Sequence, residues 1–291
     1  TKIGLISLQK GDFDRAAMEF NIVLGAHPQD YAVRYYLAAT YHELGDIDGA
    51  EREFKSIPAG SPRFTEARLQ LVQLLRENGS IREAVRTAEN LLDSLPESRD
   101  AHIALVGLYR EQKRLDRAIE VAKELVELEP ESDRYLFSLA ALYDEAGLKS
   151  EAVALLRRVI ALNPDNGAAL NYLGYTFAEL GENLDEAEAL VRKALALHPN
   201  DGFFIDSLGW IFYQRGDYSA AVTELERAAS LAGSDPVISE HLADAYRETG
   251  RNEKALRIYR DCEARTDDGK QRSRVQHKIK DLTGQPAGAP L

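Results

Sequence analysis

The sequence is poor in the residues and runs that build metal, redox and membrane sites. Cys262 is the only cysteine among 291 residues, so no disulfide can form within the chain. None of the six histidines lies three or four residues from another, so the sequence offers no helical pair of metal ligands. It has no phosphate-binding glycine loop of either standard spacing, and no apolar run approaches the roughly 18 residues of a membrane span.

Positive charge is also scarce. The chain has 36 Lys and Arg against 48 Asp and Glu, which gives a net charge of −12. This balance argues against nucleic acid as the main partner and against direct membrane insertion. Most of the acidic residues fall at solvent-facing helix positions near Lys or Arg, a pattern typical of a solvated surface rather than of an acid/base pair. We therefore expect no enzyme activity, no cofactor and no metal.

The sequence has a strong internal repeat instead. Apolar residues recur at helical spacing on both sides of Gly216, at Leu208, Ile211 and Phe212 and again at Val222, Leu225 and Ala228. The alanine five residues past this glycine belongs to a series with gaps of 34 or 35, namely Ala16, Ala50, Ala84, Ala118, Ala152, Ala187, Ala221 and Ala255. Prolines form a second series with the same gaps, at Pro28, Pro62, Pro96, Pro130, Pro164 and Pro199. Two series with one period predict a stacked array of helix pairs.

The repeat divides the chain into eight units over residues 1–269. The first is incomplete, and complete repeats start near Tyr31, Thr65, Arg99, Asp133, Gly167, Gly202 and Pro236. In the numbering used below, each of these residues is position 1 of its repeat. Three departures are expected to act locally: Lys113 replaces a turn glycine, residues 182–184 carry one extra residue, and residues 57–62 hold two prolines that end a helix early. Because Thr1 falls at position 5, we expect the chain to begin inside a helix of a longer protein.

A different element follows the repeats. Val275, Ile279 and Leu282 predict one more helix over 270–284, ended by Gly284, which covers the last repeat. Its remaining surface carries a basic cluster, consisting of Lys270, Arg272, Arg274, Lys278 and Lys280. We interpret this cluster as the solvated face of a capping helix, with a docking or phosphate-binding surface as the alternative. The tail 285–291 is expected to be disordered.

The 34-residue unit resembles the tetratricopeptide repeat. The residues that carry the resemblance in the seventh repeat are Leu208-Gly209, Phe212, Gly216, Tyr218, Ala221 and Ala228. The resemblance implies an all-α, right-handed superhelical solenoid that acts as a non-catalytic scaffold and binds a partner protein or peptide in a concave groove. The last three repeats are similar to those of long bacterial members that are often exported or membrane-anchored. This suggests a periplasmic or anchored protein, with a cytoplasmic one as the alternative.

The resemblance also implies which residues line the groove. In the family, positions 2, 5, 9 and 12 of each first helix face inward, because this spacing keeps them on one side of a helix. The candidate residues are Tyr35, Phe137, Asn171, Tyr175, Phe203, Asp206, Trp210, Tyr213, Glu240 and Asp244, with Arg247 as the nearby cation. Aromatics beside carboxylates predict a partner that buries apolar side chains and brings a Lys or Arg.

Other interpretations stay open at this stage. The aromatics of the predicted groove could instead pack between neighbouring first helices. The chain could be a self-assembling oligomeric scaffold, or the regulatory domain of a larger protein.

Overall fold

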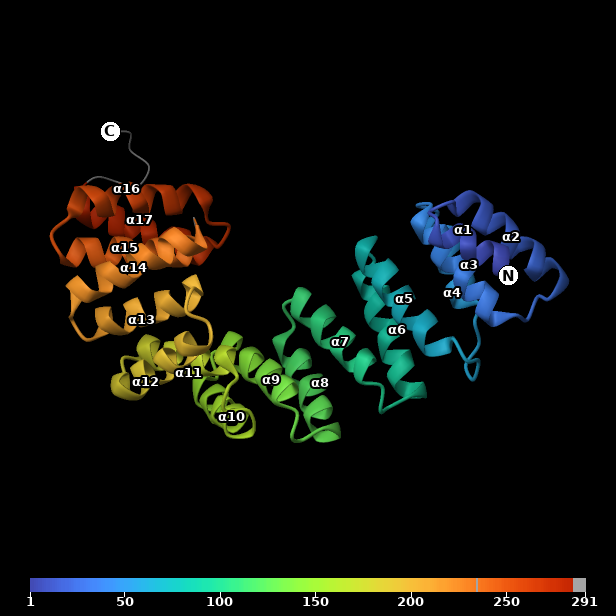
Figure 1. Ribbon diagram of the computed structural model, residues 1–291, viewed down its shortest axis with the longest axis horizontal. Coiled ribbons are helices and arrows are strands. Elements are labelled where there is room, and N and C mark those ends of the chain that lie inside the picture. The colour runs from blue at the N-terminus through green and yellow to red at the C-terminus, as the bar shows by residue number, and fades with distance from the viewer. Residues whose placement is uncertain (234, 285–291) are drawn as a thin grey trace. The chain divides into compact units, whose positions relative to one another are not determined.

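The chain is built from helices that pack in chain order. The structure, a computed structural model, describes residues 1–233 and 235–284, which contain 17 helices and no strand (Figure 1). None of these helices is both long enough and apolar enough to cross a membrane. The predicted all-α repeat solenoid is confirmed. The chain divides into two compact units, Thr1–Ala146 and the part from Gly147 onward, and each is described by itself.

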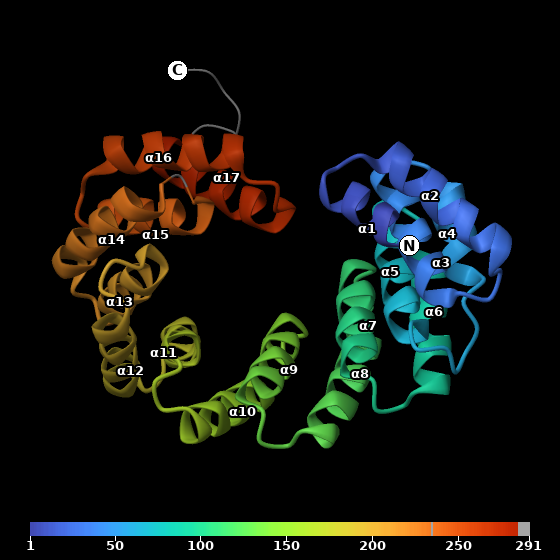
Figure 2. The ribbon, with the colours of Figure 1, turned by 45° about the vertical axis from the view of Figure 1, so that its right-hand side comes forward.

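Within each unit, helices lie beside their neighbours in the chain (Figure 2). The N-terminal unit contains α1 (Lys2–Gln9), α2 (Phe13–Ala26), α3 (Tyr31–Glu43), α4 (Ile47–Lys55), α5 (Phe64–Glu77), α6 (Ile81–Ser94), α7 (Arg99–Glu111), α8 (Leu115–Leu128) and α9 (Asp133–Glu145). The C-terminal unit contains α10 (Lys149–Leu162), α11 (Gly167–Leu180), α12 (Leu184–Leu197), α13 (Gly202–Gln214), α14 (Tyr218–Ala232), α15 (Pro236–Glu248), α16 (Asn252–Arg265) and α17 (Gly269–Thr283). From the second repeat on, odd-numbered helices up to α15 are first helices of repeats.

Short polar side chains begin many of the helices. A side-chain oxygen accepts a hydrogen bond from a first-turn backbone N–H at Asp12, Asp30, Asp46, Ser98, Ser132, Asn166, Asp201, Asp217, Asp235 and Asp268. Most turns inside the repeats end on a glycine with positive φ, such as Gly216 at 79°. In the sixth repeat the extra residue is absorbed by two left-handed residues, Gly181 and Asn183. The helix α4 has nine residues because the chain turns at Pro58.

Small residues set the distance between helices of a pair. A methyl group at Gly209, position 8 of its repeat, would lie 2.7 Å from the Leu225 side chain, and one at Gly174 would lie 2.6 Å from Val191. The alanines at position 20, from Ala16 to Ala255, are fully buried. Two helices can approach this closely only where one of them lacks a large side chain. This requirement explains both the glycines at position 8 and the alanine series.

A second contact recurs between successive repeats. The aromatic residue at position 11 meets the residue at position 25 of the preceding repeat. Where that residue is an acid, a tyrosine hydroxyl donates to it, as from Tyr109 to Glu89 and from Tyr246 to Glu226. Where it is basic, the cation lies over the ring, as in the pairs Lys123–Tyr143, Arg157–Phe177 and Arg192–Phe212, at 5.4–5.9 Å. The same pair of positions therefore forms either a tyrosine–carboxylate hydrogen bond or a cation–π contact.

Helix α17 covers the last repeat. Val275 and Ile279 are buried and Leu282 is half-buried, in one cluster with Tyr259 and Cys262 of α16. The helix ends at Gly284, which adopts a left-handed conformation with φ of 64°. The tail 285–291, for which the sequence predicts disorder, lies outside the described residues. Burial raises the pKa of the Cys262 thiol to about 11, so this cysteine is a core residue.

The turn at Lys113 predicts a stabilising substitution. Lys113 has a φ of 58°, in the region that favours glycine, whereas the equivalent turn one repeat later has Gly147 with a φ of 79°. Because a side chain in this conformation is strained, we expect Lys113→Gly to raise stability by about 0.5–1 kcal/mol, net of the extra backbone entropy of glycine. Thermal melting and hydrogen exchange in α7 and α8 measure this change. The reverse substitution, Gly147→Lys, is the matched control and should be destabilising. A lower melting temperature for Lys113→Gly would contradict the argument.

Candidate functional site

Four helices of the C-terminal unit enclose a hollow of about 460 Å³, a volume typical of ligand pockets. Its walls come from α11, α13, α15 and α17. The lining residues are Tyr175, Glu179, Trp210, Val237, Glu240, His241, Asp244, Arg274 and Lys278. We call this feature the C-terminal hollow. Four of the sequence-predicted groove residues line it, namely Tyr175, Trp210, Glu240 and Asp244, and a fifth, Asp206, is bonded to the lining residue His241.

The aromatic wall of the hollow is a stack of rings. The Trp210 ring stacks on His241 with centroids 4.1 Å apart and on Tyr213 with centroids 4.6 Å apart. Tyr175 approaches the other rings through His241, at 6.2 Å. Since Trp210 belongs to α13 and His241 to α15, the stack also joins two successive repeats. Trp210 therefore fits the alternative that the aromatics pack between neighbouring first helices, and it also lines the hollow.

A buried ion pair lies beneath the stack. His241 Nδ1 lies 3.0 Å from both carboxylate oxygens of Asp206, and both residues are almost fully buried. Burial by itself lowers the pKa of His241, but the Asp206 carboxylate outweighs burial and holds that pKa above its ordinary value of 6.5. A protonated imidazole donates from both nitrogens, so Nδ1 serves Asp206 and Nε2 has a second proton to donate.

The other two carboxylates of the predicted groove are neutralised from within the chain. Glu240 accepts hydrogen bonds from Arg274 at 2.9 Å and from Lys278 at 2.8 Å, and Lys278 also reaches Asp244 at 2.7 Å. Burial raises the pKa of Glu240, but these hydrogen bonds outweigh it and lower that pKa to about 2. Tyr259 also donates to Asp244.

The three acids of the predicted groove are thus covered, although Glu240 and Asp244 line the hollow. Asp206, Glu240 and Asp244 are only 4–5% exposed, because His241 and the cations of α17 cover them. Arg247, taken from sequence as the nearby cation, donates to Glu248 and also interacts with Asp244 and Tyr213.

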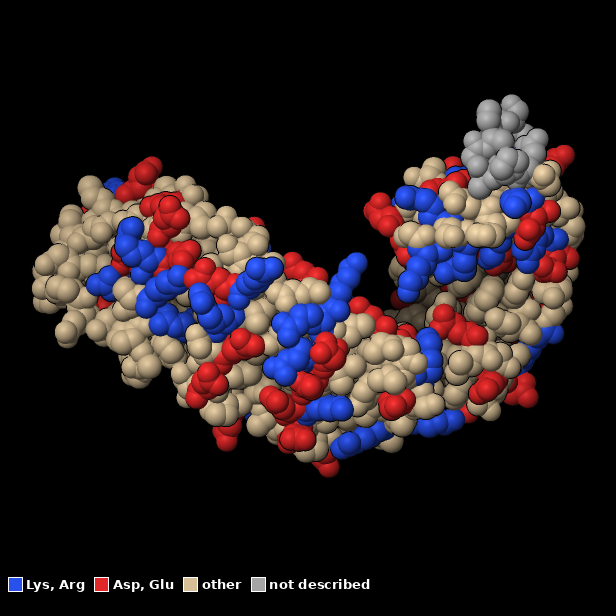
Figure 3. Space-filling model, turned by 180° about the vertical axis from the view of Figure 1, so that it is seen from behind, with Lys and Arg blue, Asp and Glu red and all other residues tan. Residues whose placement is uncertain are grey.

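The basic cluster of α17 thus has two roles: its side chains bind acceptors within the chain, and part of the cluster remains exposed to solvent. Figure 3 shows Lys and Arg side chains gathered over the C-terminal unit, beside Asp and Glu side chains. Arg274 keeps 57% of its side chain exposed while it binds Glu240, so it presents charge to both sides. Arg272 donates to the backbone carbonyls of Thr266 and Glu263. Arg272 and Arg274 are exposed, as expected for a solvated face, but these two residues and Lys278 also donate to acceptors within the chain.

The remaining predicted residues lie apart from the hollow. Tyr35 and Phe137 belong to the N-terminal unit, where Tyr35 packs edge-on against Phe54 with centroids 5.8 Å apart. Asn171 is half-buried on α11, one turn before Tyr175, and its Oδ1 is buried without a hydrogen-bond partner. Phe203 is 57% exposed at the start of α13.

The predicted groove omitted five lining residues, Glu179, Val237, His241, Arg274 and Lys278, and a wider use of the repeat could have found three of them. Val237 occupies position 2 of the last repeat, one of the groove positions, yet it was not selected. Arg274 and Lys278 follow Glu240 and Asp244 by 34 residues, so α17 takes the place of a further first helix. In that register the two cations occupy positions 5 and 9, which face the groove. His241 carries no such signal, since position 6 is outside the stripe.

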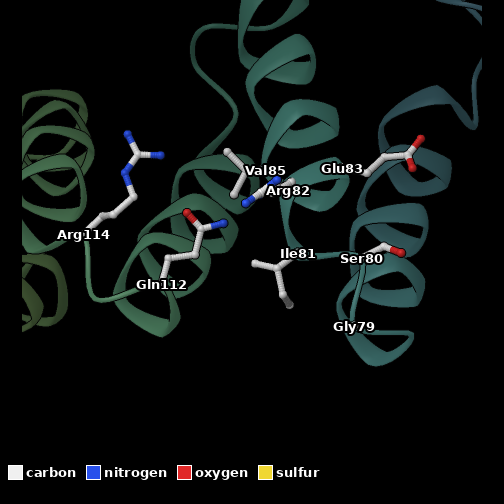
Figure 4. Close-up of a pocket in the computed structure, with 8 residues that line it drawn as sticks. All are labelled: Gly79, Ser80, Ile81, Arg82, Glu83, Val85, Gln112 and Arg114. Carbon is white, nitrogen blue, oxygen red and sulfur yellow. The ribbon is translucent and has the colours of Figure 1, made fainter.

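A larger hollow in the N-terminal unit is a weaker candidate. It measures about 950 Å³ and is formed by the turn before α6, the first turn of α6 and the turn after α7. Figure 4 shows that its polar side chains point in different directions. Glu83 is paired with Lys55 at 2.8 Å, and the Arg114 guanidinium lies over the Tyr109 ring. The polar groups of this hollow therefore do not converge on one point. Across the residues that the structure describes, no group of His, Cys, Asp and Glu is placed to hold a metal ion.

Comparisons with known proteins agree with the fold. Models of the tetratricopeptide repeat match residues 7–74, 69–133, 137–202 and 207–269. No curated protein is similar enough in sequence to match the chain.

Three solved structures illustrate the likeness in fold. A tetratricopeptide repeat protein from Parabacteroides merdae has a TM-score of 0.70 at 16% identity, over 88% of this chain and 100% of that one. The Cut9–Hcn1 hetero-tetramer of the APC/C gives 0.63 at 18% identity, over 93% of this chain but 52% of that one. PilW, a type IV pilus biogenesis factor, gives 0.60 at 18% identity, over 74% of this chain and 99% of that one. At these identities the likeness concerns the fold alone.

The ring stack predicts that Trp210 contributes to stability. Removing a half-buried indole that stacks on two rings from two helices should cost about 2 kcal/mol or more. We therefore expect Trp210→Ala to lower the melting temperature and to speed hydrogen exchange in α13 and α15. Phe203→Ala is the matched control, since it removes an exposed ring from the same helix. Equal melting temperatures for the two variants would show that the stack adds nothing to the core.

The Asp206–His241 pair predicts a pH dependence of stability. Because the folded-state pKa of His241 is raised, the pair stabilises fully below about pH 6.5, and this contribution is lost as the pH rises through the folded-state value. The melting temperature should therefore fall more between about pH 6 and about pH 9 in the wild type than in Asp206→Asn. Asp267→Asn, at an exposed site, should behave as the wild type does. A pH profile that Asp206→Asn leaves unchanged would refute the assignment.

Proposed function

Because the chain belongs to the tetratricopeptide repeat family, we propose that it is a non-catalytic interaction scaffold whose C-terminal hollow binds a partner protein or peptide. Arrays of this kind present extended surfaces made of side chains from several repeats. The C-terminal hollow has this construction, since three successive first helices and α17 each contribute to its lining.

One observation supports this proposal more than any other. Position 2 of the first helix carries large, exposed apolar side chains only in the last two repeats, with Phe203 57% and Val237 44% exposed. The same position in the five preceding repeats has small or charged residues, namely Ala32, Glu66, Asp100, Arg134 and Ala168. The fold does not require a large apolar residue there. Exposed apolar side chains beside a hollow commonly mark an interaction surface.

The chemistry of the hollow favours binding over catalysis. An aspartate that orients a histidine is half of a nucleophilic site, but such a site also needs a nucleophile within hydrogen-bond reach of the histidine. The residues that line the hollow include no serine, threonine or cysteine. The Asp206–His241 pair therefore acts here as a fixed hydrogen-bond donor.

We further propose that the protein works outside the cytoplasm or on a membrane. This rests on the similarity of its last three repeats to those of exported bacterial members of the family.

Partner capture tests the proposed surface. Phe203→Ala removes the large exposed side chain at position 2 of the seventh repeat, on a first helix that contributes to the hollow, without touching the ring stack. We expect it to reduce capture of the partner from a lysate of the source cells at least tenfold, because aromatic anchors dominate binding energy, while leaving the melting temperature unchanged. Leu231→Ala on α14 is the matched control, since Leu231 is also a large exposed apolar residue, at 47%. Equal capture by wild type, Phe203→Ala and Leu231→Ala would refute the proposal.

A further inference from the structure

The acceptors of the C-terminal hollow all have partners already. Glu240 receives hydrogen bonds from Arg274, Lys278 and Gln271. Asp244 receives them from Tyr259 and Lys278. Glu179, on α11, is bound by Lys149 at 2.8 Å. A cationic ligand would therefore have to displace an internal cation from every carboxylate it approached.

The hydrogen-bond donors of the C-terminal hollow, in contrast, do not all have partners. Trp210 Nε1 is buried and has no hydrogen-bond partner among the described residues. His241 uses Nδ1 for Asp206, and none of the described residues bonds to its Nε2. Arg274 is bound on one side and exposed on the other. An unpaired buried donor costs free energy, so these groups call for an acceptor from outside the chain. One unpaired acceptor lies nearby, Asn171 Oδ1, but Asn171 does not line the hollow.

The charged side chains of the hollow also differ in how exposed they are. Asp206, Glu240 and Asp244 are buried, and the more exposed Glu179 is paired with Lys149, whereas Arg274 keeps 57% of its side chain exposed. An acidic group can therefore bind Arg274 without displacing an internal cation. The apolar side chain of Val237, also part of the lining, lies beside this cation in the hollow.

We propose that the C-terminal hollow binds an acidic segment of the partner, in which the carboxylate of an internal Asp or Glu accepts from His241, Trp210 and Arg274 while an adjacent large apolar side chain packs on Val237. This inference rests on the proposed function and specifies the chemistry of the partner. The acidic segment takes the place of the partner's Lys or Arg that the sequence alone suggested. Arg274 and Lys278 of α17 already neutralise the carboxylates to which such a Lys or Arg would bind.

Binding of such a segment depends on pH. His241 donates from Nε2 only while it is protonated, and its pKa is raised by Asp206 on α13, with smaller contributions from Asp244 and Glu240 on its own helix. Arg274 and Lys278 of α17 and the Tyr175 hydroxyl of α11 line the same hollow as His241. Affinity should therefore be constant near pH 6 and fall as the pH rises through the pKa of His241.

The single tryptophan of the chain provides a reporter inside the site. We suggest titrating nitrogen-15-labelled protein with three capped tripeptides, Phe-Glu-Phe, Phe-Gln-Phe and Phe-Lys-Phe, and following the one indole N–H signal. The Glu peptide should shift this signal and bind about tenfold more tightly than the other two, since charge-assisted hydrogen bonds are roughly twice as strong as neutral ones. Its affinity, but not that of the Gln peptide, should fall between about pH 6 and about pH 9.

Variants of α17 test whether the preference for the Glu peptide depends on Arg274 itself or on the overall positive charge of the helix. Arg274→Gln should abolish the preference for Glu over Gln, and Arg274→Lys should restore part of it. Lys280→Gln removes one charge from the same helix at an exposed site and should bind as the wild type does. An unchanged indole signal in the unliganded variants confirms that the hollow keeps its structure.

Three outcomes would overturn the inference. These are a preference for the Lys peptide, equal affinity for the Glu and Gln peptides, and no binding of any of the three. A fourth peptide, Phe-Gln-Phe with a free terminal carboxylate, distinguishes the source of the acid. Binding of this peptide alone would assign the site to a chain terminus and refute the internal segment. If Phe203→Ala still abolishes partner capture while the peptides fail, the proposed function stands and only the acidic partner is wrong.

Discussion

Each helix pair of this protein can bury its apolar face only against the pairs beside it, and the rest of the structure depends on that constraint. A pair is too short to be stable alone, so its stability comes from the two interfaces it shares with its neighbours. Close approach needs a small residue at each crossing, which explains Gly174, Gly209 and the buried alanine series. Side chains between repeats can then vary, as the position 11 contact does when it exchanges a tyrosine–acid hydrogen bond for a cation over a ring.

The same constraint makes the end of the array different from its interior. An interior pair has a helix pair on both sides, whereas the last repeat is covered by a single helix outside the repeat pattern. Helix α17 provides that cover, and it keeps the 34-residue spacing for its two inward cations. Because Arg274 and Lys278 fall where a first helix would face the groove, the cap neutralises the acids of the last repeat. The end of the array thus combines a structural cover with the polar wall of the candidate site.

Most of the fold was predictable because a 34-residue period leaves few ways to arrange the chain. The positions of small residues and turns predict the helices, and even the odd turn at Lys113 adopts the conformation of the glycine it replaces. The candidate site was less predictable. The inward stripe identifies which side of a helix faces the groove, but exposure depends on side chains from the next helix. Asp206 illustrates this limit, since its burial depends on His241, which lies 35 residues further on and outside the stripe.

The aromatic stack shows why core and site are difficult to separate in this fold. In a globular domain a buried ring usually belongs to a central core, whereas here every interface between repeats opens onto a surface. Trp210 holds α13 to α15 through His241 and also lines the hollow. A ligand that engages His241 or Trp210 therefore contacts the same groups that join two repeats. Because coupling in such arrays is between nearest neighbours, binding there should stabilise the interface of the last two repeats and leave distant ones unaffected.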